Sequence, residues 1–177
     1  MFKSGAYKSA VLAPTVTPAH QDQRSIIASL FELYIYDFSA TLGIDVEPEG
    51  RFHAPPLDAY WSEAGRHPYL IHVGDKLAGF ALVDSKSRLS DTEGVHDVAE
   101  FFILRKYRRK RIGEQAASFL FDAFPGPWEV RQRMENGAAT EFWRAAIGRY
   151  TKGHFVELMW EDTRWRGPVQ RFDSSKR

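Results

Sequence analysis

Apolar and polar residues follow two different periods along this chain, and each period predicts a type of element. Apolar side chains recur every three or four residues between Ile27 and Leu42, which is the spacing of a helix, and Gly43 is placed to end it. Thr17 and Pro18 have the residue types that open a helix, with threonine as the cap. We therefore expect a long helix near the start of the chain.

Short runs of branched and aromatic residues predict the strands. One run is apolar from Val98 to Leu104 apart from Glu100, which is typical of a central strand that is covered on both faces. A polar, exposed turn is expected before it, over residues 86–94. The other strands are expected over residues 11–16, 69–73, 77–83, 128–135, 154–160 and 169–172.

Two further helices complete the pattern. Residues 112–123 return to helical spacing and stop before Pro125, and Asn136 is a candidate cap for a helix with apolar residues at i, i+3, i+4, i+7 and i+8. The connection over residues 43–68 is long, with a short helix expected over 57–63, and connections of this length are often functional. The order of strands and helices predicts an α/β protein with a mixed sheet.

The composition limits the chemistry. With 177 residues, 44% of them hydrophobic, the chain is expected to form a single domain over residues 1–177, with 1–10 as a poorly ordered tail. The net charge is +1, so a basic cluster is a local feature. No cysteine is present, which excludes disulfides, thiol catalysis and thiolate metal ligands, and the 6 histidines are scattered, so no metal is expected. The chain has neither a secretory signal nor an apolar run long enough for a membrane span, so a cytoplasmic protein is expected.

A basic turn links the central strand to the next helix. All residues from Arg105 to Arg111 are basic except Tyr107, and Ile112 and Gly113 begin the helix. The first N–H groups of a helix have no internal partner and lie at the positive end of its dipole, so this order predicts an anion site. A solvated charged turn and a nucleic-acid patch are the alternatives, but no second basic cluster supports nucleic acid. The glycine patterns of dinucleotide loops and Walker loops are both missing.

The turn resembles the pyrophosphate loop of the GNAT superfamily of acyl-CoA N-acyltransferases. That loop has arginine or glutamine, two free positions, glycine, one free position, and glycine or alanine, and this chain has Arg108, Arg109, Lys110, Arg111, Ile112 and Gly113. The same family has an Asn-x-x-Ala-x-x-Phe-Tyr helix, which this chain resembles at Asn136, Ala139, Phe142 and Trp143. Residues 100–109 also look like a subgroup of predicted bacterial acetyltransferases. The resemblance covers nearly the whole chain and implies a GNAT-type mixed, mostly antiparallel central sheet flanked by helices on both faces.

The resemblance also implies how acetyl-CoA, the expected co-substrate, is held. The main chain of the central strand would pair with the pantetheine arm at Phe102, Ile103 and Leu104. The turn would hold the diphosphate through Arg108, Arg109, Lys110, Arg111, Ile112, Gly113 and Glu114. The other side of the arm would be lined by Asn136, Phe142 and Trp143. Arg111 stands where the family has glycine, so it either takes a disfavoured positive φ or keeps a negative φ and places its guanidinium on a phosphate.

Glu100 is the candidate general base. Strand alternation is expected to place it on one face with Val98, Phe102 and Leu104, and an apolar setting raises the pKa of a carboxylate toward neutrality. A base is useful because an amine acceptor is normally protonated. The family commonly uses a glutamate on this strand, often through a water. The alternatives are a structural glutamate paired with a nearby arginine, and Asp97 as a substitute base.

The proton for the leaving thiolate needs a separate source. Many members of the family use a tyrosine at the position of Trp143, and an indole cannot donate in this way. Tyr150, about two helical turns on, or solvent water is therefore expected to supply the proton. With no cysteine for an acyl-enzyme, the amine is expected to attack directly in a ternary complex. The alternative function is a non-catalytic acyl-CoA-binding or sensor domain.

The acceptor is expected to be the amine of a small molecule or peptide. Asp37 lies among aromatic residues of the first helix, where it either contacts a substrate amine or is a solvated helix-face acid. Tyr60 and Trp61 either wall an acceptor pocket or pack beneath the long connection. The acids and aromatics in this part of the chain hint at a cationic amine. No nucleic acid or membrane partner is expected, and a homodimer stays open.

Overall fold

The computed structural model describes residues 13–176, in which seven strands and four α-helices follow the predicted order. The strands are β1 (Pro14–Pro18), β2 (Arg66–Val73), β3 (Lys76–Lys86), β4 (Glu93–Ile103), β5 (Pro127–Arg131), β6 (Val156–Glu161) and β7 (Arg166–Asp173). The helices are α1 (Arg24–Leu42), α2 (Ala59–Ser62), α3 (Ile112–Ala123) and α4 (Gly137–Tyr150). The predicted tail over residues 1–10, and the first two residues of the strand predicted over 11–16, lie outside the described residues.

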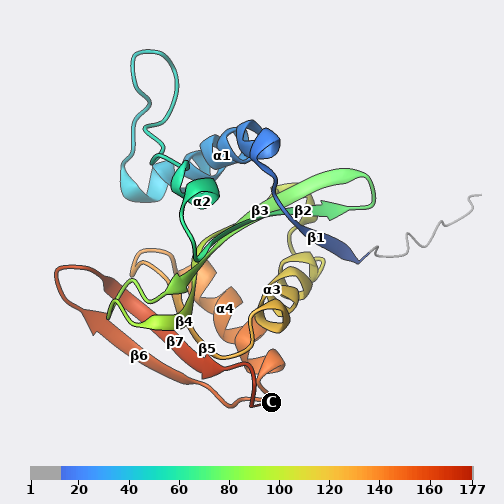
Figure 1. Cartoon of the computed structure of the whole chain (residues 1–177). Coiled ribbons are helices and arrows are strands. Elements are labelled where there is room, and N and C mark those ends of the chain that lie inside the picture. The colour runs from blue at the N-terminus through green and yellow to red at the C-terminus, as the bar shows by residue number, and fades with distance from the viewer. Residues whose placement is uncertain (1–12, 177) are drawn as a thin grey trace, which may run out of the picture.

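The strands form one sheet in the order β1-β2-β3-β4-β5-β7-β6. Neighbouring strands are antiparallel except β4 and β5, which run parallel. Helices α1 and α2 lie on one face of the sheet, and α3 and α4 lie on the other (Figure 1). We call these the α1 face and the α3/α4 face. The expected α/β class, with a mixed and mostly antiparallel sheet flanked by helices on both faces, is confirmed.

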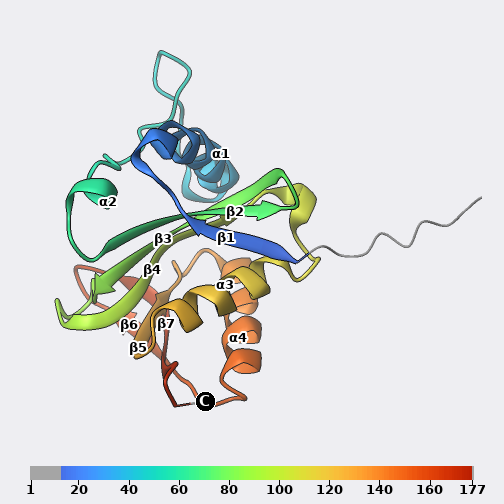
Figure 2. The ribbon, with the colours of Figure 1, turned by 45° about the vertical axis from the view of Figure 1, so that its right-hand side comes forward.

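Each face has its own hydrophobic core, because successive strand residues point to opposite faces. On the α1 face, Ile27 and Phe31 pack against strand residues Phe80, Leu82 and Phe102. The core of the α3/α4 face includes Val83, Val98, Leu120, Phe121, Trp128 and Ile147. Among the described elements, α1 and α2 cover β2, β3 and β4, and no helix covers the α1 face of β5, β7 and β6 (Figure 2).

The start of the chain differs from the prediction. Thr17 and Pro18 do not open α1, because they are the last residues of β1 and pair with Leu70 and Tyr69 of β2. A short 3-10 turn over Gln21–Gln23 follows, and only then does α1 begin. The backbone pairing with β2 outweighs the local cap signal. The end of the helix is as predicted, since Gly43 has a φ of 63° and closes α1.

Several strand boundaries also moved. The turn predicted over residues 86–94 is shorter, because β3 and β4 continue to a pair between Lys86 and Glu93. Strand β5 ends at Arg131 and not at residue 135, although the N–H of Gln132 still donates to the carbonyl of Pro168 in β7 at 3.1 Å. Pairing between β3 and β4 thus extends these two strands beyond the limits that the local pattern predicts.

A bulge in β4 changes which residues share a face. Leu82 pairs with Glu100 but Val83 pairs with Val98, so β4 has one extra residue, Ala99, relative to β3. Glu100 and Phe102 therefore face α1, whereas Val98 packs in the core of the α3/α4 face. The expectation that Val98 shares a face with Glu100 is wrong. The same bulge brings Asp97 onto the α1 face beside Glu100.

Candidate active site

A gap opens between β4 and β5 at the centre of the sheet. The two strands pair only at His96 with Trp128 and at Asp97 with Glu129. From Val98 onward, the described residues give β4 no partner strand on this side. Strands that separate in this way leave main-chain N–H and C=O groups available to an extended ligand, as at the edge of a sheet.

The hydrogen bonds of β4 decide which residues can use this gap. The N–H of Leu104 donates to the carbonyl of Ala78 in β3 at 2.8 Å, and its own carbonyl accepts from Tyr107 at 2.8 Å. Because bonding directions alternate along an antiparallel pair, Phe102 also faces β3, and Ile103 faces the gap. Of the three residues predicted to pair with pantetheine, only Ile103 is therefore directed toward the gap. Phe101, which the sequence prediction did not include, has the same orientation.

The basic turn ends in an unpaired helix start. The first intrahelical bond of this region is from the N–H of Gln115 to the carbonyl of Arg111, at 3.0 Å. For the N–H groups of residues 109–114, no acceptor is found in the described part of the chain. Arg111 is the residue before α3, and no side chain caps this end. The predicted anion site is thus present as geometry: several amides without partners at the positive end of a helix.

Arg111 adopts the glycine-like conformation. Its φ is 61°, and Arg109 has a φ of 57°, so both are in the left-handed region. The alternative of a negative φ with the guanidinium on a phosphate is wrong: the Arg111 guanidinium donates to Glu114 at 3.0 Å. Glu114 is held a second time by Arg149 at 2.8 Å, and hydrogen bonds from these two arginines lower the pKa of its carboxyl. The ion pair between Arg111 and Glu114 stabilises the left-handed conformation of Arg111, which costs about 1–2 kcal/mol for a non-glycine residue.

Replacing Arg111 by glycine is expected to leave the acetyl-CoA dissociation constant within about twofold, because glycine adopts a positive φ without strain. Replacing it by valine is expected to weaken binding roughly tenfold, since a β-branched residue at positive φ must move the loop. Calorimetric titration of both variants measures the difference. Weaker binding to the glycine variant than to the valine variant would mean that the guanidinium itself contacts the ligand.

The other side chains of the turn divide into two groups. Arg108 donates from Nε to the carbonyl of Ile103 at 2.7 Å and pairs with Asp37 of α1. Arg105 also donates to Asp37, at 2.9 Å. Arg109 and Lys110 are exposed, and neither has an ion pair within the described residues. These two side chains are free to meet phosphate groups.

Helix α4 closes the other side of the gap. A Cβ added to Gly113 would lie 3.2 Å from the ring of Phe142 and 3.4 Å from Ile103, so α3, α4 and β4 meet closely here. The ring of Trp143 lies 5.0 Å from that of Phe101. The side chain of Asn136 accepts from the N–H of Ala139 at 3.1 Å, which is the predicted helix cap. The structure thus brings Gly113, Phe142 and Trp143 beside the gap, whereas the Asn136 side chain serves the helix.

Glu100 has a partner that the sequence analysis did not identify. The hydroxyl of Tyr34, from α1, donates to Oε2 of Glu100 at 2.7 Å. Burial raises the pKa of Glu100, while this hydrogen bond and the charges of Arg88 and Arg131 act in the opposite direction. No arginine forms an ion pair with Glu100 in the described residues, so the structural alternative lacks its expected partner. The only signal for Tyr34 was its place in the helical apolar pattern, which predicted core packing.

Asp97 is fully buried and paired. Arg131 of β5 donates from Nε to its Oδ2 at 2.8 Å and from a second nitrogen to Oδ1 at 3.1 Å. The Arg131 side chain is 6% exposed and Asp97 is 0% exposed. Burial raises the pKa of Asp97, and Arg131 opposes this effect. Because both oxygens accept from Arg131, Asp97 is a poor substitute for the base and is better suited to positioning β5 against β4.

Tyr150 is not brought to Glu100. Its hydroxyl donates to Asp122 near the end of α3 at 2.7 Å, and its ring packs against Phe121 and Phe172 on the α3/α4 face. Glu100 is on the opposite face, under Tyr34. Because its hydroxyl is bonded to Asp122, Tyr150 is less suited to donate a proton to a leaving group, and its role as general acid stays a prediction.

The predicted acceptor residues have structural partners. Asp37 is neither solvated nor open to an amine, because Arg105 and Arg108 occupy its carboxylate. The indole N–H of Trp61 donates to the carbonyl of Ala19 at 2.9 Å, which supports the packing alternative. Tyr60 is buried, and its hydroxyl accepts from Arg88 at 3.3 Å. These contacts hold α2 and the long connection against the sheet.

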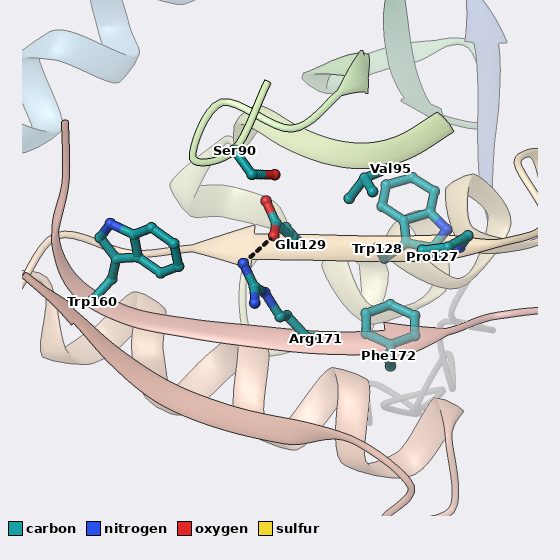
Figure 3. A pocket seen from close by; sticks show the side chains of 8 residues that line it. All are labelled: Ser90, Val95, Pro127, Trp128, Glu129, Trp160, Arg171 and Phe172. Carbon is teal, nitrogen blue, oxygen red and sulfur yellow. Dashed lines mark ion pairs between the residues drawn. The ribbon is translucent and has the colours of Figure 1, made fainter. Parts of the chain in front are cut away.

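A hollow of about 560 Å³ lies along β5 and β7. Figure 3 shows Glu129 pointing toward Arg171 within it, with Trp160 on the neighbouring strand. Glu129 accepts from Arg171 at 2.6 Å and from the hydroxyl of Ser87 at 2.5 Å. Glu129 and Arg171, which form polar walls of this hollow, lie on the part of the α1 face that no described helix covers.

Metal ligands and membrane spans are both missing from the described part of the chain. No group of three or more histidine, aspartate or glutamate side chains is arranged to hold a metal ion within residues 13–176. Over the same residues, none of the helices has the length and hydropathy needed to cross a bilayer.

Solved acetyltransferase structures share this fold. An acetyltransferase from Thermus thermophilus superposes with a TM-score of 0.67 at 14% identity, over 92% of this chain and 98% of that one. Spermidine N-acetyltransferase from Vibrio cholerae, solved with CoA and spermine, gives 0.59 at 11% identity, over 92% and 96%. The ribosomal-protein-S18-alanine N-acetyltransferase from Escherichia coli gives 0.52 at 15% identity, over 92% and 94%. At these identities the likeness concerns the fold alone.

Sequence comparison identifies the family directly. Among curated proteins no sequence matches this chain. The sequence model of the Acetyltransferase (GNAT) family, however, matches residues 27–155, which include the gap, the basic turn and Glu100. The match spans more than half of the chain and coincides with the geometry described above. The chain therefore belongs to the GNAT acetyltransferase family.

Proposed function

We propose that this protein transfers an acetyl group from acetyl-CoA to a primary amine, by direct attack in a ternary complex. The observation that carries the proposal is the gap between β4 and β5, which ends at the unpaired amides before α3. An acyl chain that pairs along β4 and a diphosphate at those amides fit the two ends of one continuous site. The exposed Arg109 and Lys110 add positive charge where the phosphates would lie.

The residues of β4 and α1 supply the base. Glu100 lies on the α1 face next to the gap, and Tyr34 occupies its Oε2, whereas no donor to Oε1 is found in the described residues. Oε1 is thus free to take a proton from the acceptor ammonium, directly or through a water. The raised pKa of Glu100 brings it nearer to that of an amine, which favours general-base catalysis.

The remaining steps need little from the protein. Bound acetyl-CoA supplies a thioester, whose carbonyl carbon forms the new C–N bond as its C–S bond breaks. One proton of the ammonium goes to Glu100 before the attack, and the second, which the nitrogen loses as the amide forms, reaches the thiolate through solvent water. Trp143 and Phe142 pack beside β4, where they exclude water from the arm. Phe101 and the N–H of Ile103 are directed to pair with the arm as an additional strand would, whereas the Ile103 carbonyl already accepts from Arg108.

Acetyl-CoA is expected to raise the melting temperature of the protein. Ligand at one hundred times its dissociation constant adds about 2.7 kcal/mol, or roughly 5–10 °C for a chain of this size. Acetyl-pantetheine, which has the thioester but no diphosphate, is the control and is expected to give a much smaller shift because it cannot use the amides before α3. No shift with millimolar acetyl-CoA, or equal shifts with the two ligands, would contradict the proposed site.

A further inference from the structure

Asp84, Asp97, Glu100 and Glu129 are buried or half-buried acids of the sheet strands on the α1 face, and three of them have arginine partners. Asp84 accepts from both Arg66 and Arg88 at 2.9 Å. Asp97 accepts from Arg131 at 2.8 Å, and Glu129 accepts from Arg171 at 2.6 Å. Figure 3 shows the last of these pairs inside the hollow. The exception is Glu100, whose partner is the Tyr34 hydroxyl. These three carboxylates are therefore already neutralised, whereas Glu100 has no cation bound to it in the described residues.

One arginine of the same region has no such partner. Arg133 follows β5, is exposed, and forms no ion pair within the described residues. Its guanidinium carbon lies 5.7 Å from the centre of the Trp165 ring, and that of Arg131 lies 4.5 Å from the same ring. Trp165 immediately precedes β7. Two guanidinium groups thus stand at one indole on the open part of the α1 face.

Shared contacts link Arg133 to the strand that carries Glu100. Arg131, which shares the indole with Arg133, is bound to Asp97, three residues before Glu100 on β4. Burial raises the pKa of the Tyr34 phenol, and the charges of Arg133 and Arg131 act in the opposite direction. An unpaired arginine at the rim of a site offers a planar fork of donors that matches a carboxylate or a phosphate.

We infer that the acceptor is a small amine that also carries an acidic group, which Arg133 binds while the amine meets Glu100. This inference rests on the proposed acetyl transfer and specifies its substrate class. Among the described acids of the sheet strands, Glu100 is the one without a basic partner, and it must receive the proton, so a polyamine bound at the sheet would leave its other charges unpaired beside arginines. An acidic amine instead gains a charge-assisted pair with Arg133. This acceptor differs from the cationic amine that Asp37, Asp45, Tyr60 and Trp61 suggested in the sequence, three of which have structural partners.

Matched amines test this directly. We would measure thiol release from acetyl-CoA with a thiol reagent, which has no background here because the chain contains no cysteine. The pairs are L-phenylalanine with phenethylamine, L-lysine with cadaverine, and O-phosphoethanolamine with ethanolamine. The acidic member of a pair is expected to have a kcat/KM roughly 10- to 100-fold higher. The first two pairs report on a carboxylate and the third on a phosphate. Equal or better use of phenethylamine, cadaverine or spermidine would overturn the inference.

The substitution Arg133→Met identifies the residue responsible. It is expected to raise KM for the acidic amine roughly 10- to 100-fold, to leave kcat nearly unchanged, and to remove the preference over the partner that lacks the acidic group. Arg166→Met, an exposed arginine of β7 paired with Glu161, is the matched control and should leave the preference intact. Arg133→Lys should restore part of it. A preference that survives Arg133→Met would contradict the assignment.

Failure of the transfer reaction itself has a different signature. If no amine releases thiol, the anion site is still measured by calorimetric titration of N-acetyl-L-phenylalanine and N-acetylphenethylamine into the CoA complex. Tighter binding of the acidic compound, lost in Arg133→Met, would support the site although the proposed activity had failed. Equal binding of the two compounds would overturn the site. Acetyl-CoA binding, measured separately, is expected to be the same in all these variants.

Discussion

Glu100→Gln is expected to lower kcat roughly 100- to 10,000-fold, which is the usual contribution of a general base. Glutamine keeps the size of the side chain and can still accept from the Tyr34 hydroxyl, but it cannot take the proton of the ammonium. The dissociation constant of acetyl-CoA is expected to be unchanged, because the amides proposed to bind the diphosphate belong to residues 109–114, beyond the end of β4, and not to Glu100. Thiol release with a saturating acceptor measures the effect, and calorimetry provides the check on binding.

The pH profile separates a base from a structural glutamate. Burial raises the pKa of Glu100, and the base works only when it is deprotonated, so kcat/KM should rise with pH through a range above that of an ordinary glutamate. Glu100→Gln should remove this limb. Tyr34→Phe is the matched variant. The hydrogen bond from the Tyr34 hydroxyl lowers the pKa of Glu100, so loss of this bond should move the rising part of the pH profile to higher pH. If Glu100→Gln retained the activity and the limb, the glutamate would be structural.

Asp97→Ala is expected to reduce the free energy of unfolding by about 3–5 kcal/mol, the cost of leaving one partner of a buried ion pair alone. Arg131 would remain with its side chain 6% exposed and without its carboxylate. The ion pair between Asp97 and Arg131 joins β4 to β5 where the two strands are still hydrogen-bonded, so the substitution should also change the shape of the gap. Urea unfolding monitored by tryptophan fluorescence and by circular dichroism measures the change.

Two further variants make the result specific. Asp97→Ala combined with Arg131→Met should cost less than Asp97→Ala alone, because no buried charge is then left unpaired. Glu161→Ala removes an exposed ion pair with Arg166 and should have little effect on stability. A loss below about 1 kcal/mol for Asp97→Ala would mean that Arg131 finds water or another acceptor after the substitution.

The order of elements followed from local patterns. The period of apolar residues is a property of each segment, and the segments that become α1 and α4 bury most of the side that their spacing predicts. In α3 the spacing was less accurate, because Phe119 is exposed and Phe121 is buried instead. Local signals were also sufficient for Gly43 at the end of α1 and for the Asn136 cap. They failed at Thr17 and Pro18, where a good helix opening is used as the end of a strand because β2 pairs with it.

The candidate site was predicted in part. The basic turn, Gly113 and Phe142 are brought together as the motif spacing implied. Arg111 kept the backbone of the glycine that it replaces, which a motif comparison alone could not decide. The contact of Arg133 with Trp165 and the burial of Asp97 beside Arg131 depend on residues far apart in the chain, and no local pattern encodes them.

By itself, the sequence determined the α/β class, the strand–turn–helix unit that forms the anion site, and Glu100 as the carboxylate in an apolar strand. These depend on neighbours within a few residues, whose side-chain period and charge can be read directly. Only the tertiary structure decided that a bulge at Ala99 places Asp97 and Glu100 on one face, and that Tyr34 donates to Glu100 across 66 positions of sequence. Register and long-range contacts are selected by packing of the whole sheet, so they exist only once the strands have assembled.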